Sequence, residues 1–181
     1  MKTTVAILLL SGLLASPAAA SEPSPSCPLH DQHMAAGQAE QGGHAASAEH
    51  FTGVDRRGDE VMGFSHQRTV HHFLLDPEGG TIQVEARDPG DTGSLRQIRA
   101  HLAEVARQFA AGDFSMPQEI HGRVLTGVPE MIRRKDAITY RFEELENGGR
   151  VLLRTSDPDA RAAIHAFLKD QIGDHRTGDP H

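Results

Sequence analysis

The chain contains an internal repeat, and this repeat restricts the possible folds more than any local propensity does. Residues 69–89 align without a gap over residues 138–158, which lie 69 positions further along the chain. Five positions are identical: Phe73 matches Phe142, Gly79-Gly80 matches Gly148-Gly149, and Asp88-Pro89 matches Asp157-Pro158. Each copy has the pattern of a strand, a Gly-Gly turn, a second strand and an Asp-Pro pair that opens a helix. The repeat therefore predicts two ββα units.

Apolar and polar residues alternate on both sides of each Gly-Gly turn, which is typical of β-hairpins. The strands are predicted over residues 68–75 and 81–87 in the first copy, and over 137–144 and 150–156 in the second. Helices with one apolar stripe are predicted over residues 94–110 and 158–172. Asp91 or Ser94 is placed to cap the first helix, and Asp157 the second. The predicted fold class is α+β, with two ββα repeats forming a four-stranded antiparallel sheet and two helices on one face.

The two-residue period of a strand assigns side chains to the two faces of the sheet. Phe73, Ile82 and Val84 fall on the face that packs against the helices, and His71 lies on the same side. Tyr140 occupies the position in the second copy that His71 occupies in the first. We expect the opposite face to be solvated.

The first 20 residues have the features of a secretory signal peptide. A basic start precedes an apolar run over residues 5–15 and small residues at Ala18 and Ala20, so cleavage is predicted after Ala20. The apolar run is shorter than the ~20 residues that cross a bilayer. Cys27 lies well beyond this run with no aliphatic residue three positions before it, which argues against a lipid anchor. We therefore expect a periplasmic or secreted protein with no stable membrane anchor.

Residues 21–60 are predicted to form a disordered leader, because small and polar residues dominate and bulky apolar side chains are too few to offset the ordering entropy. The leader has no Lys or Arg up to residue 50 and holds Cys27, His30, His33 and Met34. Such an acidic, His-rich segment is typical of a weak metal collector, whereas an incidental thiol is the alternative interpretation of Cys27. The folded domain is predicted over residues 61–175, with a flexible C-terminal tail over residues 176–181.

Composition and motifs exclude several classes of protein. A single Cys in 181 residues rules out an intramolecular disulfide framework and a Cys₄ zinc module. The net charge of −7 argues against nucleic acid as a partner. The chain has no G-x-S-x-G, P-loop, H-E-x-x-H or C-x-x-C-H motif. We therefore expect neither a nucleotide cofactor nor haem c.

Histidine is unusually abundant, with twelve residues in the chain. We predict that His71 from a strand, His101 from a helix and His121 from the segment after it meet at one end of the sheet, together with Met62 or Met116. Three imidazoles suit zinc or Cu(II), and an imidazole with a thioether suits copper. The alternative is that His71 is a core residue satisfied by one hydrogen bond.

Other histidines are weaker candidates. His66 and His72 lie close to His71 in the sequence, but adjacent strand residues point to opposite faces, so His71 and His72 do not share a metal unless the strand is distorted. His175 and His181 belong to a polar C-terminal segment and are not expected to be ordered ligands.

The segment over residues 111–136 is too long for a simple connection. It is either a functional loop or a lid over the helix–sheet layer, in which Val124, Leu125, Val128 and Ile132 contribute to the core.

Six short runs remain: Met62-Gly63-Phe64, Thr69-Val70-His71-His72-Phe73, Gly112-Asp113-Phe114, Ile120-His121, Gly127-Val128-Pro129 and Asp174-His175-Arg176-Thr177-Gly178-Asp179. Together these runs resemble a family of small, uncharacterised bacterial exported proteins, over about residues 61–179. The resemblance implies bacterial export, and it implies no activity and no catalytic residue.

Three functions are open at this point. The first is an exported transition-metal binding protein, for copper above all, with the leader as a low-affinity collector. The second is a non-catalytic module that binds an envelope protein or a second copy of itself through sheet edges. The third is a metal-dependent hydrolase in which Asp113 or Glu119 assists the histidines.

Overall fold

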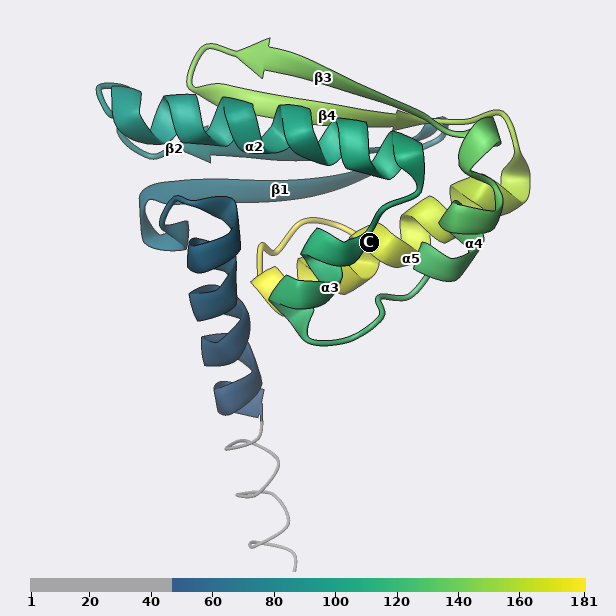
Figure 1. The fold of residues 1–181 in the computed structure, drawn as a ribbon, viewed down its shortest axis with the longest axis horizontal. Helices are drawn as coiled ribbons and strands as arrows, with labels where there is room; N and C mark the ends of the chain where they lie inside the picture. The colour runs from purple at the N-terminus through teal and green to yellow at the C-terminus, as the bar shows by residue number, and fades with distance from the viewer. Residues whose placement is uncertain (1–46) are drawn as a thin grey trace, which may run out of the picture. The chain divides into compact units, whose positions relative to one another are not determined.

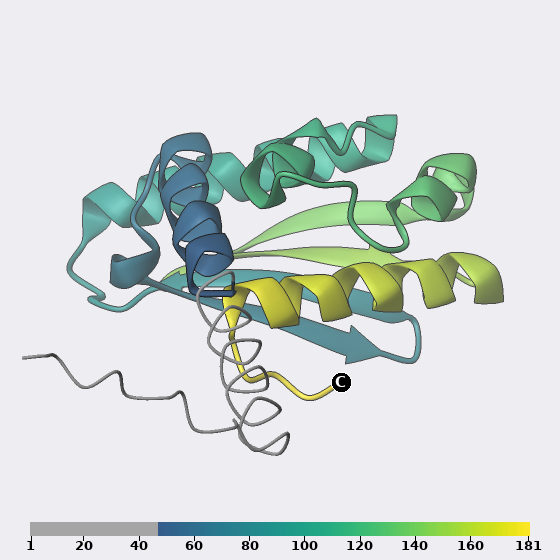
Figure 2. The ribbon, with the colours of Figure 1, turned by 90° about the horizontal axis from the view of Figure 1, so that it is seen from below.

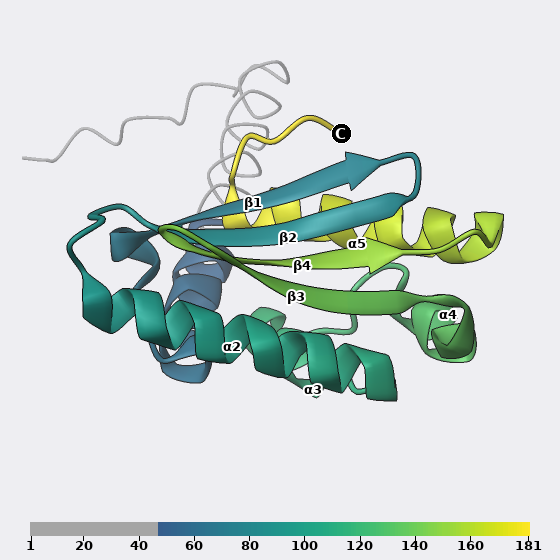
Figure 3. The same ribbon diagram turned by 90° about the horizontal axis from the view of Figure 1, so that it is seen from above.

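The computed structural model describes residues 47–181, in which a four-stranded antiparallel sheet covers a layer of helices (Figure 1). The strands are β1 (Thr69–Asp76), β2 (Gly79–Ala86), β3 (Thr139–Leu145) and β4 (Gly148–Arg154). Their order in the sheet is β1-β2-β4-β3, so the two hairpins meet through their second strands (Figure 3). The predicted fold class is confirmed, and both Gly-Gly pairs lie at the start of a second strand.

The register of the sheet agrees with the sequence repeat. Ile82 of β2 lies directly opposite Val151 of β4, and these two residues are equivalent in the repeat. Gly80 lies opposite Leu153, and Val84 lies opposite Gly149, which is the same pairing with the two copies exchanged. The two hairpins are therefore related by an approximate two-fold axis that passes between Ile82 and Val151.

The two long helices, α2 (Thr92–Ala111) and α5 (Pro158–His175), lie on the same face of the sheet, with α2 mainly over β3 and β4 and α5 over β1 and β2 (Figure 2). The Asp91 side chain accepts a hydrogen bond from the Ser94 amide and caps α2. The Asp157 side chain accepts from two amides at the start of α5. Asp88-Pro89 does not open a helix, because α2 begins three residues later at Thr92. In the second copy, Asp157-Pro158 does so as predicted.

The segment after α2 forms two short helices, α3 (Ser115–His121) and α4 (Val128–Arg133), followed by the 3₁₀ turn η2 (Lys135–Ala137). Leu125 and Val128 are buried as predicted. Val124 and Ile132 are 60% and 40% exposed, so their predicted core positions are wrong, and Met131 is buried instead. Gly127 has a φ of +82°, and a Cβ there would lie 2.1 Å from the Ala163 carbonyl oxygen, which shows how closely α4 approaches α5.

A helix over residues 47–62 corrects the predicted domain boundary, because the composition predicts a disordered leader up to residue 60. Val54 is fully buried in the core, and the Arg57 side chain donates a hydrogen bond of 2.7 Å to the Ile120 carbonyl oxygen. Phe51, Val54 and Val61 are spaced to share one side of a helix, which provides the apolar contact that the composition of the leader as a whole conceals. The 3₁₀ turn η1 (His66–Arg68) connects this helix to β1.

The C-terminal residues also differ from their prediction. Helix α5 continues to His175, and the chain then runs along the free edge of β1 (Figures 2 and 3). One Asp179 carboxylate oxygen accepts a hydrogen bond of 2.8 Å from the Phe73 amide, and the other lies 2.9 Å from His72 Nδ1. Residues 176–181 are therefore tied to the sheet, not a free tail. Within residues 47–181, no helix has the length and apolar character that crossing a membrane requires.

Candidate functional site

A small cavity lies between the sheet and the helices. Its free volume is about 50 Å³. The side chains with nitrogen or sulfur atoms on its wall are Met62, His71, His101, Met116, His121, Gln171 and His175, and the rest of the wall is apolar. Four imidazoles and two thioethers therefore face one space that is enclosed mainly by aliphatic and aromatic side chains.

Five separate segments supply these side chains. His71 comes from β1, His101 from α2, and Met62 from the end of the helix over residues 47–62. Met116 and His121 come from α3, and His175 from the last turn of α5 with Gln171 one turn before it. The structure thus brings together His71, His101, His121, Met62 and Met116, the residues that the sequence placed at one end of the sheet.

His71 carries one of two cavity-wall polar atoms that are buried without a hydrogen-bond partner among the described residues, the other being on Gln171. Its Nε2 atom is buried and has no hydrogen-bond partner within residues 47–181. The ring stacks on His175, with ring centroids 5.5 Å apart and ring planes 10° apart. Burial and, to a smaller extent, the neighbouring imidazole of His101 together lower the pKa of His71 to about 4. The predicted alternative, a core histidine satisfied by a hydrogen bond at its ring, does not describe this Nε2 atom.

His101 and His175 are in a similar environment. Burial lowers the pKa of His101 to about 4, and the ring meets Phe64 edge to face at 5.5 Å. Burial also lowers the pKa of His175 well below its usual value, and the adjacent His71 and His121 act in the same direction. All three imidazoles are therefore neutral near pH 7, with a lone pair on one ring nitrogen.

His121 differs because both of its ring nitrogens have neighbours. Nδ1 lies 2.7 Å from an Asp174 carboxylate oxygen, and Nε2 lies 3.1 Å from the Gln171 side-chain oxygen. Burial lowers the pKa of His121 despite the opposing effect of Asp174, so the ring is neutral and donates its proton from Nδ1. The Gln171 amide nitrogen is buried without a partner, and a half-turn of this amide would direct its N–H to Nε2. His121 is thus held by α5.

The remaining predicted residues lie elsewhere. His72 points away from the cavity and contacts Asp179, while His66 sits outside it beside Asp59. Asp113 and Glu119 are exposed, and no carboxylate of the described residues lines the cavity, so the two carboxylates of the hydrolase hypothesis do not join the histidines there. Cys27, His30, His33 and Met34 lie outside the described residues.

Sequence reasoning missed two residues of the cavity, His175 and Gln171. Both lie on the buried side of α5, four residues apart, and His175 continues the stripe of Ile164, Leu168 and Ile172 by one helical turn. That spacing was a usable signal. The polar composition of residues 173–181 hides this signal, because it predicts that the helix ends at Ile172.

The side chains of the cavity do not form a complete site for a hard or borderline metal ion. Across residues 47–181, no three His, Cys, Asp or Glu side chains are grouped closely enough to hold a metal ion. An ion in the cavity would therefore need a thioether ligand or a rotation of the imidazoles.

Comparisons with models of protein families, with curated proteins and with solved structures find no match to this chain.

Proposed function

We propose that the protein is an exported copper-binding protein whose folded domain holds one Cu(I) ion in the cavity. The observation that carries this proposal is the buried, unpartnered Nε2 atom of His71 on a wall that also bears thioether sulfurs. Leaving a buried polar atom unpaired costs about 1–3 kcal/mol, and a bound ion is one way in which a native structure satisfies such an atom.

The size of the cavity favours an ion over an organic ligand. Pockets for small molecules and cofactors have volumes of roughly 300–1,000 Å³. The free volume here is about 50 Å³, which is room for an ion and a bound water molecule.

The chemistry of the wall favours Cu(I) over zinc. Thioether sulfur is a soft ligand that selects Cu(I), whereas zinc sites use thiolate, imidazole and carboxylate groups. Met62 is buried and Met116 is half-buried, and both face the imidazoles. The neutral imidazoles can bind a cation without first losing a proton.

The leader belongs to the same proposal. Cys27, His30, His33 and Met34 supply further soft and imidazole ligands in an acidic stretch, which suits a low-affinity collector that raises the local concentration of metal.

A competition titration of the chain from Ser21 onward tests the proposal. Cu(I), kept reduced under anaerobic conditions, is divided between the protein and the chelator bicinchoninate, and Zn(II) and Cu(II) are titrated in parallel. To separate the domain from the leader, the same titration is run on the chain from Ser21 onward with Cys27, His30, His33 and Met34 all replaced by Ser. We expect this variant to keep one tight Cu(I) site.

Two matched substitutions locate that site. Met116→Leu removes a thioether from the cavity, and we expect it to weaken Cu(I) binding at least about tenfold, or about 1.4 kcal/mol. Met131→Leu makes the same change at a core methionine that does not line the cavity, and it should leave the affinity unchanged. Two results would overturn the proposal and favour an interaction module. One is loss of Cu(I) binding when the leader ligands are replaced, and the other is an unchanged Cu(I) affinity in Met116→Leu and His71→Asn.

A further inference from the structure

A polar surface cleft of about 220 Å³ adjoins the cavity. We call it the access cleft; the side chains of its wall that matter here are Asp55, His66, His71, Arg87, His175 and Arg176. His71 and His175 also line the cavity, so this stacked pair is the wall between the two spaces. We infer that the metal ion reaches the cavity through the access cleft, with His66 as its first ligand and the His71–His175 pair as the relay inward.

The geometry of His66 supports its role as the first ligand. Its Nδ1 atom lies 2.8 Å from an Asp59 carboxylate oxygen, which also accepts a 2.7 Å hydrogen bond from the His66 amide. Donation from Nδ1 leaves the lone pair on Nε2, and metal-binding histidines are oriented by a carboxylate in this way. The Nε2 atom lies 3.7 Å from an Asp55 oxygen, so an imidazole nitrogen and a carboxylate stand together in the cleft.

The metal-binding groups of the access cleft are suited to passing an ion inward and not to holding it tightly. Arg176 donates a 2.8 Å hydrogen bond to Asp55, so this carboxylate is shared between the guanidinium and any arriving cation. Two donors give a weak site, from which an ion moves readily to the imidazoles and thioethers behind it. The cavity offers softer ligands in an apolar setting, which provides the driving force for a soft ion.

The inference rests on the proposed function, and its test separates the two. A substitution on the entry route, outside the final site, changes the rates of metal binding and release by the same factor. It therefore leaves the equilibrium affinity unchanged. The chain with the Ser-substituted leader is loaded with Cu(I) and mixed with excess bathocuproine disulfonate, and the coloured complex reports the release rate. Bicinchoninate competition gives the affinity of the same samples.

Arg87→Trp narrows the access cleft at an exposed side chain with no ion-pair partner among the described residues, and Arg96→Trp is the control at an exposed position of α2. We expect release to slow at least about tenfold in Arg87→Trp and in His66→Ala, with the affinity changed less than about twofold. Arg96→Trp and His165→Ala should match the wild type.

An unchanged release rate in Arg87→Trp would overturn the route, and an unchanged rate in His66→Ala would overturn the role of His66. A weaker affinity at an unchanged release rate would overturn both, because His66 would then belong to the equilibrium site. Absence of tight Cu(I) binding by the parent chain would be the failure of the proposed function itself.

Discussion

Three residues in the cavity combine a titratable imidazole with burial in an apolar environment. His71, His101 and His175 are imidazoles largely removed from water, so hydration stabilises their protonated forms much less than it does for a free imidazole. Burial of a neutral imidazole is tolerated, but burial of a charged one is not. The same arrangement that keeps lone pairs free for a ligand therefore makes the fold sensitive to acid.

This sensitivity leads to a prediction for the metal-free protein. His71 and His101 have a pKa of about 4 in the native state, against 6.5 for an ordinary imidazole. Between these two values the unfolded chain binds more protons than the native one, so the free energy of unfolding falls as the pH falls. Each residue contributes at most about 3 kcal/mol to this loss. Urea unfolding followed by circular dichroism, in the presence of a chelator, measures it.

The variant His101→Leu separates this effect from general acid denaturation. Leucine fills a similar apolar position and does not titrate, so we expect a shallower loss of stability between about pH 6.5 and pH 4. Carboxylates such as Asp174 have a lowered pKa, for although burial raises it, hydrogen bonds from His50 and His121 lower it more. Protonation of these carboxylates destabilises the protein only below the pH range in which the histidines titrate. Equal slopes for the variant and the wild type would contradict the assignment.

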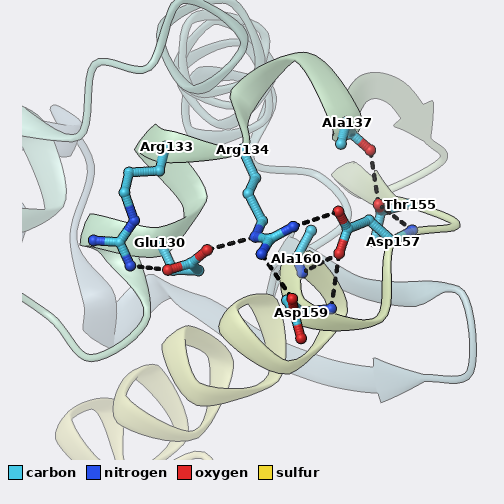
Figure 4. Close-up of polar contacts among 8 residues, drawn as sticks. All are labelled: Glu130, Arg133, Arg134, Ala137, Thr155, Asp157, Asp159 and Ala160. Atoms are coloured by element: carbon cyan, nitrogen blue, oxygen red, sulfur yellow. Dashed lines mark hydrogen bonds and ion pairs between the residues drawn. The ribbon is translucent and has the colours of Figure 1, made fainter.

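At the scale of elements, a cluster of charged side chains joins α4 to the start of α5 (Figure 4). The Arg134 guanidinium donates to Asp157 at 2.6 Å and to Asp159 at 2.7 Å, and it also pairs with Glu130 on its own helix. Asp157 caps α5 at the same time. One arginine therefore holds the cap of one helix against the end of another.

Removing this arginine should loosen the contact between the two helices. We expect Arg134→Ala to lower the free energy of unfolding by about 1 kcal/mol, because three carboxylates lose one shared partner. Arg133→Ala is the matched control, since the Arg133 side chain is 68% exposed and pairs with Glu130 alone among residues 47–181, and no measurable change is expected. Thermal unfolding of both variants measures the difference, and equal melting temperatures would show that the cluster carries no stability.

The elements were predictable where local rules and the repeat agreed. Both hairpins, the caps Asp91 and Asp157, and the inward face of His71 followed from turn residues and the two-residue period. The helix over residues 47–62 did not, because its Gly53 and Gly58 lower helix propensity and its stability comes from tertiary contacts such as those of Val54. Strand order was also beyond local rules, since it depends on which hairpin edges pair.

At the scale of the whole molecule, the cavity forms because segments from the two ends of residues 47–181 close over the sheet. The helix over residues 47–62 contributes Met62, and the last turn of α5 contributes His175, more than 100 residues away. His50 contacts Asp174 at 3.2 Å, and Arg176 contacts Asp55, so the two ends also bind each other. The sequence predicted Met62, Met116 and three of the four histidines of this site, and it missed Gln171 and His175, because their place depends on how α5 packs.

The C-terminal residues have a second effect on the whole molecule, which is to cover the free edge of β1. An open edge strand exposes amides that can pair with another chain. In β1, the Phe73 amide instead donates a hydrogen bond to the Asp179 carboxylate, which also contacts His72. Hydrogen bonds to charged groups contribute about 1.5–3 kcal/mol. We therefore expect Asp179→Ala to speed hydrogen exchange of the Phe73 amide roughly tenfold or more, as measured by NMR.

The amide of Ile82 is the internal reference for this measurement, because β2 is a central strand paired on both sides. Its exchange should stay unchanged in Asp179→Ala, which distinguishes local opening of the edge from a loss of global stability. The variant should also associate more readily at high concentration, since the edge of β1 is then free to pair with a second copy. A Phe73 amide that exchanges at the wild-type rate would show that the C-terminal residues rest on β1 without protecting it.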